Sequence, residues 1–224
     1  MSMLSNLDLL RRVPLFSMLN AAQAEPIAEA IVKRRFKRGE IIVEQGKKAN
    51  ALFIILTGRA RVMTSDRRGR EVILASMQPG DHIGEMSLID DEPHSATVRA
   101  EVQTDVLMLG RAEFARCLPD SSSMAYALVR GLVQRLRHAD RKIESLALMD
   151  VYGRVARALL ESARSEPDGT LLIRDKVSRQ DIAKMVGASR EMVSRVMKDL
   201  EERGLTELQP NGTMVIRERL DPPE

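Results

Sequence analysis

The segment from residue 177 to residue 204 constrains the fold of this chain more than any other. Its sequence, VSRQDIAKMVGASREMVSRVMKDLEERG, predicts two short helices joined by a sharp turn at Gly187. Small polar residues occupy the positions where the two helices would begin. Glycines occupy the positions where the helices would end, which often need a left-handed backbone conformation. The predicted caps are Ser178 with Asp181 as its capping-box partner, Ser189 at the start of the second helix, and Gly204 at its end.

Apolar residues recur at helical spacing in both predicted helices. The first helix is expected to bury Ile182, Met185 and Val186, and the second to bury Met192, Val193, Val196, Met197 and Leu200. The exposed side chains at the start of the second helix would then be Arg190, Glu191, Ser194 and Arg195. A DNA-binding helix-turn-helix needs polar side chains there, because the N-terminal end of its second helix meets base edges in the major groove. An ordinary helical hairpin with solvated charges is the alternative.

Two short β-prone runs follow these helices. Residues 205–208 and 213–216 flank Gln209-Pro210-Asn211-Gly212, and Asn-Gly between apolar runs is a strong signal for a β-hairpin. Two helices followed by such a hairpin have the order of a winged helix. The wing would lie over the sugar–phosphate backbone of DNA.

The composition is that of a globular chain long enough for two domains. The chain has 224 residues, of which 44% are hydrophobic and 30% are charged, and its formal net charge is only +3. A uniformly basic surface is therefore excluded, and the 3% of aromatic residues argues against a platform that stacks single-stranded bases. The first residues contain no apolar run as long as a signal peptide or a membrane span. We therefore expect a cytoplasmic protein with no membrane partner.

Cysteine and histidine usage restricts the chemistry further. Cys117 is the one cysteine of the sequence, which excludes a disulfide within the chain and a four-thiolate metal or iron–sulfur site. We expect a buried thiol here and not a redox switch. His82, His94 and His138 have no spacing typical of haem ligands, and no metal site is expected. Phosphate-loop and nucleophile-elbow signatures are absent, so no enzyme is expected.

The first 120 residues have a different sequence pattern from the rest of the chain. From Phe36 onward, short β-prone runs are interrupted by glycines, which predicts a small antiparallel barrel or roll. The predicted strands are 40–43, 52–56, 60–64, 72–77, 95–102 and 106–109. No long helix is expected before Ser121. The predicted class is α+β, with a β-roll sensor domain over 1–120, a long helix over 121–148 and a winged-helix domain over 149–224.

The long helix predicted over 121–148 contains no proline. Its apolar residues keep a heptad spacing, which favours the seam of a parallel coiled coil. The predicted seam residues are Val129, Leu132, Leu136, Ala139, Ile143 and Leu146. A helix packed on the core of its own domain is the alternative. Because a two-fold DNA reader needs two copies of the chain, we favour a homodimer. A further helix over 151–163 and a turn over 166–169 would begin the DNA-binding domain.

A glycine-rich motif in the roll is a candidate sensor. The sequence GDHIGEMSL over 80–88, with PHSATV over 93–98, predicts a hinged turn with free backbone N–H groups and a short helical turn after Gly84. Such a nest beside serines suits an anion such as a phosphate. Glu85 would suit a ribose hydroxyl, since a carboxylate accepts its hydrogen bond. A tight turn of the roll with no ligand is the alternative.

The chain resembles the CRP/FNR family, which comprises the bacterial cyclic-AMP receptor protein and its relatives. The resemblance lies in the order of its parts: the roll, the motif, the long helix and the helix-turn-helix. The resemblance runs from about Leu15 to Ile216, and its most specific parts are FKRGEIIVEQG (36–46), the motif over 80–100 and SRQDIAKMVGASREMVSR (178–195). It implies a jelly-roll domain that binds a cyclic nucleotide and a homodimer whose winged helices bind double-stranded DNA at an inverted repeat. It also implies contact with RNA polymerase.

The resemblance implies roles for residues of the helix-turn-helix. Arg179 matches a phosphate contact, and Arg190, Glu191 and Arg195 match base readers. Arginine can donate two hydrogen bonds to guanine, and glutamate can accept one from cytosine. Ser194 matches a serine of the fumarate–nitrate branch, so we expect half-sites with a TGTGA-like or TTGA-like core. The full expected DNA-binding set is Arg179, Gln180, Ser189, Arg190, Glu191, Ser194 and Arg195.

The ligand contacts implied by the resemblance are Gly84, Glu85, Met86, Ser87, His94, Ser95, Arg135 and Asp140. His94 stands where cyclic-nucleotide-binding members have an arginine paired with the cyclic phosphate, and histidine is largely neutral at pH 7. Ala139 and Asp140 stand where the cyclic-AMP receptor has a Thr-Ser pair that donates to adenine. Asp140 could instead accept from a guanine edge.

These departures weaken the case for cyclic AMP and leave room for cyclic GMP or cyclic di-GMP. They also fit a constitutive regulator that has lost its effector. A nucleotide-binding module whose helical hairpin contacts protein is a further alternative. No cofactor beyond the possible effector is required.

Overall fold

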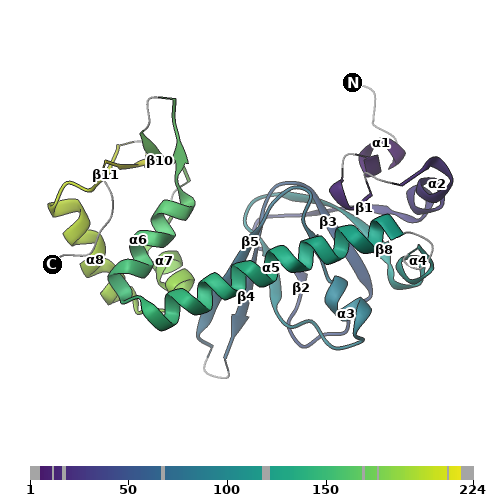
Figure 1. Ribbon diagram of the computed structural model, residues 1–224, viewed down its shortest axis with the longest axis horizontal. Coiled ribbons are helices and arrows are strands. Elements are labelled where there is room, and N and C mark those ends of the chain that lie inside the picture. Colours follow the sequence, from purple (N-terminus) through teal and green to yellow (C-terminus); the bar gives the residue numbers. More distant parts are fainter. Residues whose placement is uncertain are drawn as a thin grey trace. The chain divides into compact units, whose positions relative to one another are not determined.

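The computed structural model of the chain describes residues 6–11, 13–16, 19–66, 69–117, 122–167, 170–175, 177–210 and 212–217. The chain divides into two compact units, Met1–Leu136 and Arg137–Glu224. The long helix α5 (Ser122–Leu148) contributes residues to both units (Figure 1). No helix within these described ranges is long and apolar enough to span a membrane.

The first unit contains two four-stranded antiparallel sheets, in the orders β1-β8-β3-β6 and β2-β7-β4-β5. Their strands are β1 (Val32–Phe36), β2 (Ile41–Val43), β3 (Ala51–Thr57), β4 (Ala60–Ser65), β5 (Glu71–Met77), β6 (His82–Ile83), β7 (Thr97–Ala100) and β8 (Thr104–Gly110). The predicted antiparallel roll is therefore confirmed. The prediction misses β1, because it is an edge strand of sequence VKRRF in which only Phe36 is buried. It also misses β6, which has two residues.

Apolar side chains from both sheets form a core inside the roll. Phe36 of β1 and Phe53 of β3 meet edge to face, with ring centroids 6.4 Å apart. The turn between β3 and β4 depends on Gly58, which has a φ of +91°. A Cβ at Gly58 would come within 2.5 Å of the carbonyl oxygen of Gln103. Only glycine therefore fits this turn.

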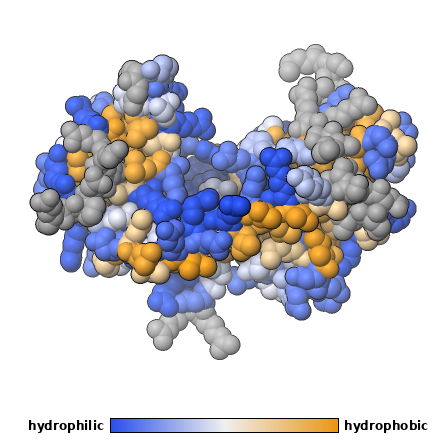
Figure 2. All heavy atoms as spheres, viewed as in Figure 1, coloured by the Kyte–Doolittle hydropathy of each residue, from blue (hydrophilic) through white to orange (hydrophobic). Residues whose placement is uncertain are grey.

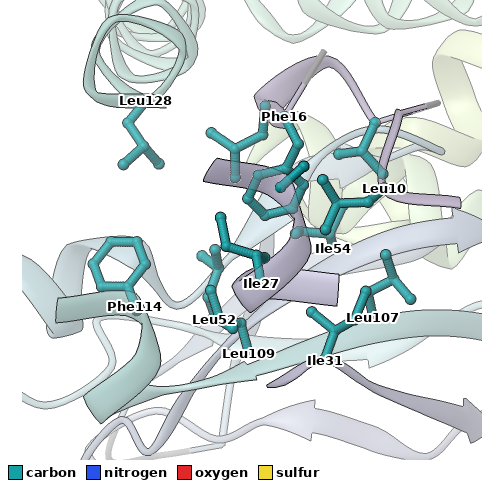
Figure 3. Packing of buried hydrophobic residues seen from close by; sticks show 13 residues of the cluster. Leu10, Phe16, Ile27, Ile31, Leu52, Ile54, Leu107, Leu109, Phe114 and Leu128 are labelled. Carbon is teal, nitrogen blue, oxygen red and sulfur yellow. The ribbon is translucent and has the colours of Figure 1, made fainter. Parts of the chain in front are cut away.

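Helices cover the opposite face of the sheet β1-β8-β3-β6. They are α1 (Asn6–Arg11), the 3-10 turn η1 (Pro14–Phe16), α2 (Ala21–Ala30) and α4 (Arg111–Cys117). Their apolar side chains pack on Leu52, Ile54, Leu107 and Leu109 and form a second core that includes Leu128 of α5 (Figure 3). Successive strand residues thus alternate between the two cores, as the two-residue period of a strand requires. Cys117 ends α4, and because its side chain lies outside the described residues, the buried thiol stays a prediction.

The expectation of no long helix before Ser121 is wrong for α2, which has 10 residues. A capping box begins this helix. The side chain of Asn20 accepts from the Gln23 backbone N–H at 2.9 Å, and Gln23 Oε1 accepts from the Asn20 N–H at 3.2 Å. The signal was therefore present in the sequence. Pro26 inside the segment argues against a helix, because proline removes a helical hydrogen bond.

The helix α5 confirms the long helix predicted over 121–148. Its exposed large apolar residues include Tyr126, Val129, Val133, Leu136, Ile143 and Leu146. The seam itself stays a prediction. Leu132, one of its predicted residues, is half-buried, whereas Val133, which the prediction lacks, is 44% exposed. Figure 2 shows apolar side chains gathered over the N-terminal half of α5.

The second unit combines a helix-turn-helix with an antiparallel sheet in the order β11-β12-β10-β9. Its elements after α5 are α6 (Val151–Ser162), β9 (Arg164–Ser165), β10 (Leu171–Ile173), α7 (Arg179–Val186), α8 (Arg190–Glu202), β11 (Thr206–Leu208) and β12 (Met214–Ile216). The predicted hairpin is thus present as β11 and β12. The prediction lacks β9 and β10, which are too short to show a pattern. They lie on either side of the turn predicted over 166–169, of which residues 168 and 169 are outside the described ranges.

Local caps define both helices of the helix-turn-helix. The Ser178 hydroxyl accepts from the Asp181 N–H at 3.0 Å, and it donates to the Asp181 carboxylate at 2.9 Å. The predicted capping box is therefore incomplete, because the carboxylate binds the hydroxyl and not the backbone of the cap. Gly187 takes the predicted left-handed conformation, with a φ of +65°. Gly204, with a φ of +69°, ends α8 in a Schellman motif that also uses Leu205 N–H.

Replacing Ser189 with alanine is expected to lower the free energy of unfolding by about 1 kcal/mol. The Ser189 hydroxyl accepts from the Met192 N–H at 3.2 Å, and alanine would leave that donor without a partner. Urea unfolding followed by circular dichroism would measure the change. Ser189→Asp is the control, because aspartate caps equally well, and equal losses in both variants would contradict the capping role.

Candidate DNA-binding surface and effector site

Four side chains of α8 line one open hollow on the surface of the second unit. They are Arg190, Glu191, Ser194 and Arg195, the set predicted to meet base edges. The helix faces this way because Val193, Met197 and Leu200 are buried in the core shared with α6 and α7. The hollow is therefore a consequence of the amphipathic pattern of α8.

The charged groups of this hollow are available to a ligand. Arg190, Glu191 and Arg195 are exposed, and none of them forms an ion pair within the described ranges. Two guanidinium groups and one carboxylate close together can donate to guanine and accept from cytosine. One prediction for this helix is wrong: Met192 is 44% exposed and not buried. Its side chain points away from that of Val193, because successive residues of a helix are turned by about 100°.

The remaining predicted DNA contacts lie near the N-termini of α7 and α8. Arg179 is the first residue of α7, and its Nη2 lies 3.6 Å from Glu201 Oε1. Both side chains of this pair are substantially exposed, so the pair is weak and leaves Arg179 able to turn toward a phosphate. Gln180 is exposed as well. The hydroxyl of Ser189 accepts the capping bond and keeps its hydrogen as a donor.

In the first unit, Gly84 turns the chain from β6 into α3 (Glu85–Ile89), which confirms the predicted helical turn. Gly84 has a φ of +93°, and a Cβ there would come within 2.9 Å of the Ala51 carbonyl oxygen. Both the conformation and the close approach require glycine. The turn therefore brings the first residues of α3 close to the backbone of β3.

Glu85 and Arg135, which the sequence placed in one site, form an ion pair. Arg135 Nη1 donates to Glu85 Oε1, and its Nη2 donates to the carbonyl oxygen of His82. Glu85 is 1% exposed. Burial raises the pKa of its carboxyl, and the charge of Arg135 acts in the opposite direction. Glu85 Oε2 has no hydrogen-bond partner among the described residues, so it is free to accept a hydrogen bond from a ligand hydroxyl.

His82 packs against α5, a contact that the sequence did not predict. Its ring lies beside Gly131, where a Cβ would come within 2.5 Å of His82 Cε1. Burial, and secondarily the charge of Arg135, lowers the pKa of His82 to about 4. The imidazole is therefore neutral at pH 7 and serves as a packing group. The sequence gives no signal for this contact, because it joins a glycine within a helix to a strand of only two residues.

His94 lies beside Gly84 and is bound to Ser87. Its Nδ1 is 3.2 Å from Ser87 Oγ, and both side chains are buried. Burial lowers the pKa of His94, so the ring is neutral at pH 7. A neutral ring can donate one hydrogen bond to a phosphate, whereas an arginine would supply a full charge and two donors.

Arg111, the first residue of α4, was missed by the sequence reasoning. Its guanidinium donates to the carbonyl oxygens of Ala49 and Ser87 at 3.2 and 3.1 Å and pairs with Asp91 at 2.8 Å. Asp91 has a φ of +62°, an uncommon conformation for a residue other than glycine. Arg111 thus holds together three segments around the motif.

The other predicted ligand contacts do not join this cluster. Met86 is 46% exposed, and Ser95 is exposed. Neither has a hydrogen bond to the buried residues of the motif within the described part of the chain. Asp140 is an exposed residue of α5 in the second unit. The roles of these three residues stay predictions.

A larger hollow, of about 720 Å³, lies elsewhere in the first unit, between β1, β3 and the N-terminal segment. Its described lining includes none of the predicted ligand contacts. Two of its charged groups already bind each other, since Arg35 donates to Asp105 at 2.6 Å and 3.0 Å. The cluster at Gly84 is therefore the better candidate for a nucleotide. Within the described ranges, no three His, Cys, Asp or Glu side chains are placed to hold a metal ion.

Comparison with known proteins identifies both domains of the chain. A model of the cyclic nucleotide-binding domain matches residues 33–121, and a model of the Crp-like helix-turn-helix domain matches residues 153–220. The cAMP-activated global transcriptional regulator Vfr of Pseudomonas aeruginosa is 38% identical over 193 residues, which cover 82% of this chain and 88% of Vfr. The chain belongs to the CRP/FNR family. Its relatives are transcription regulators and not enzymes, and this CRP/FNR protein is accordingly a DNA-binding transcription regulator.

Two further relatives span almost the whole of this CRP/FNR protein. The cAMP-activated global transcriptional regulator CRP of Salmonella typhimurium is 32% identical over 197 residues, covering 84% of this chain and 92% of CRP. The solved structure of the c-di-GMP-responsive global regulator CLP of Xanthomonas campestris superposes with a TM-score of 0.77 at 27% identity, over 89% of this chain and all (100%) of CLP. The fold predicted from the sequence is thus the fold of the family.

Proposed function

We propose that this protein is a homodimer that reads an inverted repeat in double-stranded DNA under the control of a nucleotide second messenger. The observation that supports control by a ligand is the buried cluster at Gly84. It contains an ion pair, a hydrogen-bonded histidine and the unpartnered acceptor Glu85 Oε2. A buried acceptor with no partner costs free energy, so it indicates a hydroxyl supplied by a ligand.

Each side chain of the cluster has a chemical role in this proposal. Glu85 accepts from a ribose hydroxyl, and Arg135 supplies the positive charge near the phosphate. Ser87 orients His94 through Nδ1. When the Ser87 hydroxyl donates to Nδ1, the proton of the neutral ring resides on Nε2, which can then donate to a phosphate oxygen.

The relatives point to two kinds of effector. Vfr and CRP are described as cAMP-activated, and CLP as c-di-GMP-responsive. A neutral His94 weakens the phosphate contact that a cyclic mononucleotide relies on. Asp140 offers an acceptor suited to the N–H groups of guanine and unsuited to an adenine edge that needs donors. We therefore favour a guanine nucleotide, cyclic GMP or cyclic di-GMP, over cyclic AMP.

The exposed apolar residues of α5 support the homodimer. A helix in water does not ordinarily expose Tyr126, Val129, Val133 and Leu136 on one side, and a second copy of α5 would cover them. Two recognition helices about 34 Å apart would then read two half-sites one helical turn apart. In this role the protein acts in the cytoplasm and contacts RNA polymerase, as the family resemblance implies.

Fluorescence anisotropy on a palindromic duplex with TGTGA-type half-sites tests the proposal. Binding is measured at fixed salt without ligand and with cyclic AMP, cyclic GMP or cyclic di-GMP. We expect one guanine nucleotide to change the affinity at least tenfold, which corresponds to about 1.4 kcal/mol of coupling. A response to cyclic AMP alone would contradict the guanine assignment.

A constitutive regulator is the second candidate, favoured by the observation that His94 is neutral where the cyclic-AMP receptor has arginine. In that case the protein binds the duplex with the same affinity without ligand and with each nucleotide. Direct calorimetric titration of each nucleotide into the protein separates a lost site, which gives no heat, from a site that binds without changing DNA affinity.

A further inference from the structure

Arg111, the first residue of α4, binds two segments that also hold His94. Its backbone N–H donates to the carbonyl oxygen of Asn50 at 3.0 Å, and its Nε donates to that of Ala49 at 3.2 Å. Both acceptors lie in the loop between β2 and β3. The Nη2 of Arg111 donates to the carbonyl oxygen of Ser87 in α3 at 3.1 Å. One residue of α4 therefore joins this loop to α3.

His94 is bound from the same two sides. Its carbonyl oxygen accepts from the Gly46 N–H at 2.8 Å, and its N–H donates to the Lys47 carbonyl oxygen at 2.9 Å, both in the loop between β2 and β3. Its Nδ1 lies 3.2 Å from Ser87 Oγ. The loop thus holds the backbone of His94 and α3 holds its ring, while Arg111 binds the loop and α3 to each other.

The two carbonyl contacts are the stronger part of this arrangement. Ala49 is 1% exposed and Ser87 is 3% exposed, so both bonds lie in partly buried surroundings, where hydrogen bonds are stronger. Ser87 lies in the last turn of α3, where carbonyl groups lack partners within the helix. The contact with Asp91 is weaker, because that side chain is 77% exposed. Arg111 thus uses all three guanidinium nitrogens on protein groups.

We propose that Arg111 is a positioning residue of the effector site, which fixes the loop between β2 and β3 against α3 and so keeps the His94 imidazole in place. This inference rests on the effector site proposed above. Arg111 acts on the ligand through His94, because its guanidinium nitrogens bind protein groups. Its removal loosens the His94 side of the site, and a loosely held contact binds a ligand less well. The ion pair of Glu85 and Arg135 stays, because its two members bind each other.

The titration of the imidazoles, followed by nuclear magnetic resonance of the full chain without ligand, tests this role. Burial lowers the pKa of His94 in the wild-type protein. In Arg111→Gln we expect this pKa to rise toward the ordinary value of about 6.5, because a loosened ring meets water. The pKa of His82, about 4, should not change. A residue that only stabilised the roll would lower the melting temperature and leave both pKa values as they are.

Two variants serve as controls. Arg116→Gln removes a charge from the same helix at an exposed position, where Arg116 pairs with Glu113 at 3.6 Å, and it should keep the wild-type titration of His94. Arg111→Lys keeps the positive charge, but its single nitrogen cannot bind acceptors on both segments as the fork of arginine does. We therefore expect the pKa of His94 to rise in Arg111→Lys as well. A rise in Arg111→Gln alone, or no rise in either variant, would overturn the proposal.

The other charged groups on the segments that hold His94 are the same in every variant. Glu85 is paired with Arg135. The charged side chains of the loop between β2 and β3 and of the segment after α3 are exposed: Glu44, Lys47, Lys48, Asp90, Asp91 and Glu92. Because salt screens exposed charges, the titration is measured at about 0.15 M salt. A change in the pKa of His94 then reports the substituted arginine.

Calorimetric titration of cyclic AMP, cyclic GMP and cyclic di-GMP gives the second readout. We expect Arg111→Gln to weaken the binding of the effector by about tenfold, and Arg116→Gln to change it within about twofold. In a His94→Ala background, Arg111→Gln should change the affinity by less than about twofold, because a positioning residue then has no ring to position. A loss as large as that in the wild-type background would overturn the proposal.

The two readouts separate this proposal from the effector site on which it rests. If none of the three nucleotides binds the wild-type protein, the proposed effector site fails, and the titration of His94 still decides whether Arg111 holds the ring. If a nucleotide binds and the Arg111 variants change neither the affinity nor the pKa of His94, only the role of Arg111 fails.

Discussion

Replacing Glu191 with alanine is expected to relax the choice of base at one position of each half-site by about 1–3 kcal/mol, or roughly 5- to 160-fold in relative affinity. The Glu191 carboxylate is exposed in the hollow of α8 and has no ion pair within the described ranges, so it can accept from the N4 amino group of cytosine. A base that presents an acceptor opposite the Glu191 carboxylate is repelled. Alanine removes both the attraction to cytosine and this repulsion. Anisotropy with a panel of duplexes varied at each half-site position, at one fixed salt, measures the change.

Arg179→Ala is the matched control for this experiment. Its guanidinium is expected on a phosphate, which carries no sequence information. The variant should weaken binding to every duplex alike and lower the slope of log affinity against log salt by about one. Unchanged selectivity in Glu191→Ala, or a base-dependent loss in Arg179→Ala, would contradict the assigned roles.

Replacing His94 with arginine is expected to tighten the binding of a cyclic nucleotide by about tenfold or more, which is roughly 1.4 kcal/mol. The buried imidazole of His94 is neutral at pH 7 because burial lowers its pKa. A guanidinium is charged at every accessible pH and presents two parallel donors to a phosphate. Calorimetric titration of cyclic AMP and cyclic GMP into both proteins gives the affinities.

The pH dependence of binding provides a second readout for the same substitution. A bound phosphate stabilises the charged ring and raises the pKa of His94 above its value in the free protein, so binding takes up a proton once the pH falls toward the pKa of the complex. The affinity of the wild-type protein should therefore rise as the pH falls toward and below about 6, near the ordinary histidine pKa of about 6.5. In His94→Arg this rise should be lost, and any titration of Glu85 is common to both proteins.

His138→Arg is the control for the pH experiment, because it makes the same chemical change on α5. It should keep the wild-type profile. A flat wild-type profile, or a tightening in His138→Arg equal to that in His94→Arg, would contradict the phosphate contact.

The helix-turn-helix shows which features could be predicted from the sequence. Ser178, Gly187 and Ser189 act on backbone groups within one turn, so their residue types are enough to place the helix ends. The hollow at Arg190 follows from the same local pattern. Met192 is the exception, because an apolar residue at the edge of an amphipathic face can lie on either side of it.

The first unit shows where prediction from the sequence stops. β1 is cationic, and among the described strands it pairs with β8 alone. Its strand conformation therefore comes from a partner about 70 residues away and not from alternation. The capping box of α2 can be recognised in the sequence, but Pro26 inside the segment argues against a helix there. Arg111 gives no signal, since its role depends on three segments that meet only in the folded roll.

By itself the sequence determined the order of the roll, the long helix and the helix-turn-helix, the glycine turn at Gly84 and the polar side chains that α8 exposes. The reason is that caps, turns and hydrophobic periodicity act over a few residues. Only the tertiary structure decided that Arg135 meets a buried Glu85, that His82 packs on Gly131, and that Val133 is exposed in place of Leu132. The physical reason is that burial and pairing depend on which elements approach one another. A helix face turns by about 100° with each residue, so one residue decides whether a side chain meets the core, a ligand or a second copy.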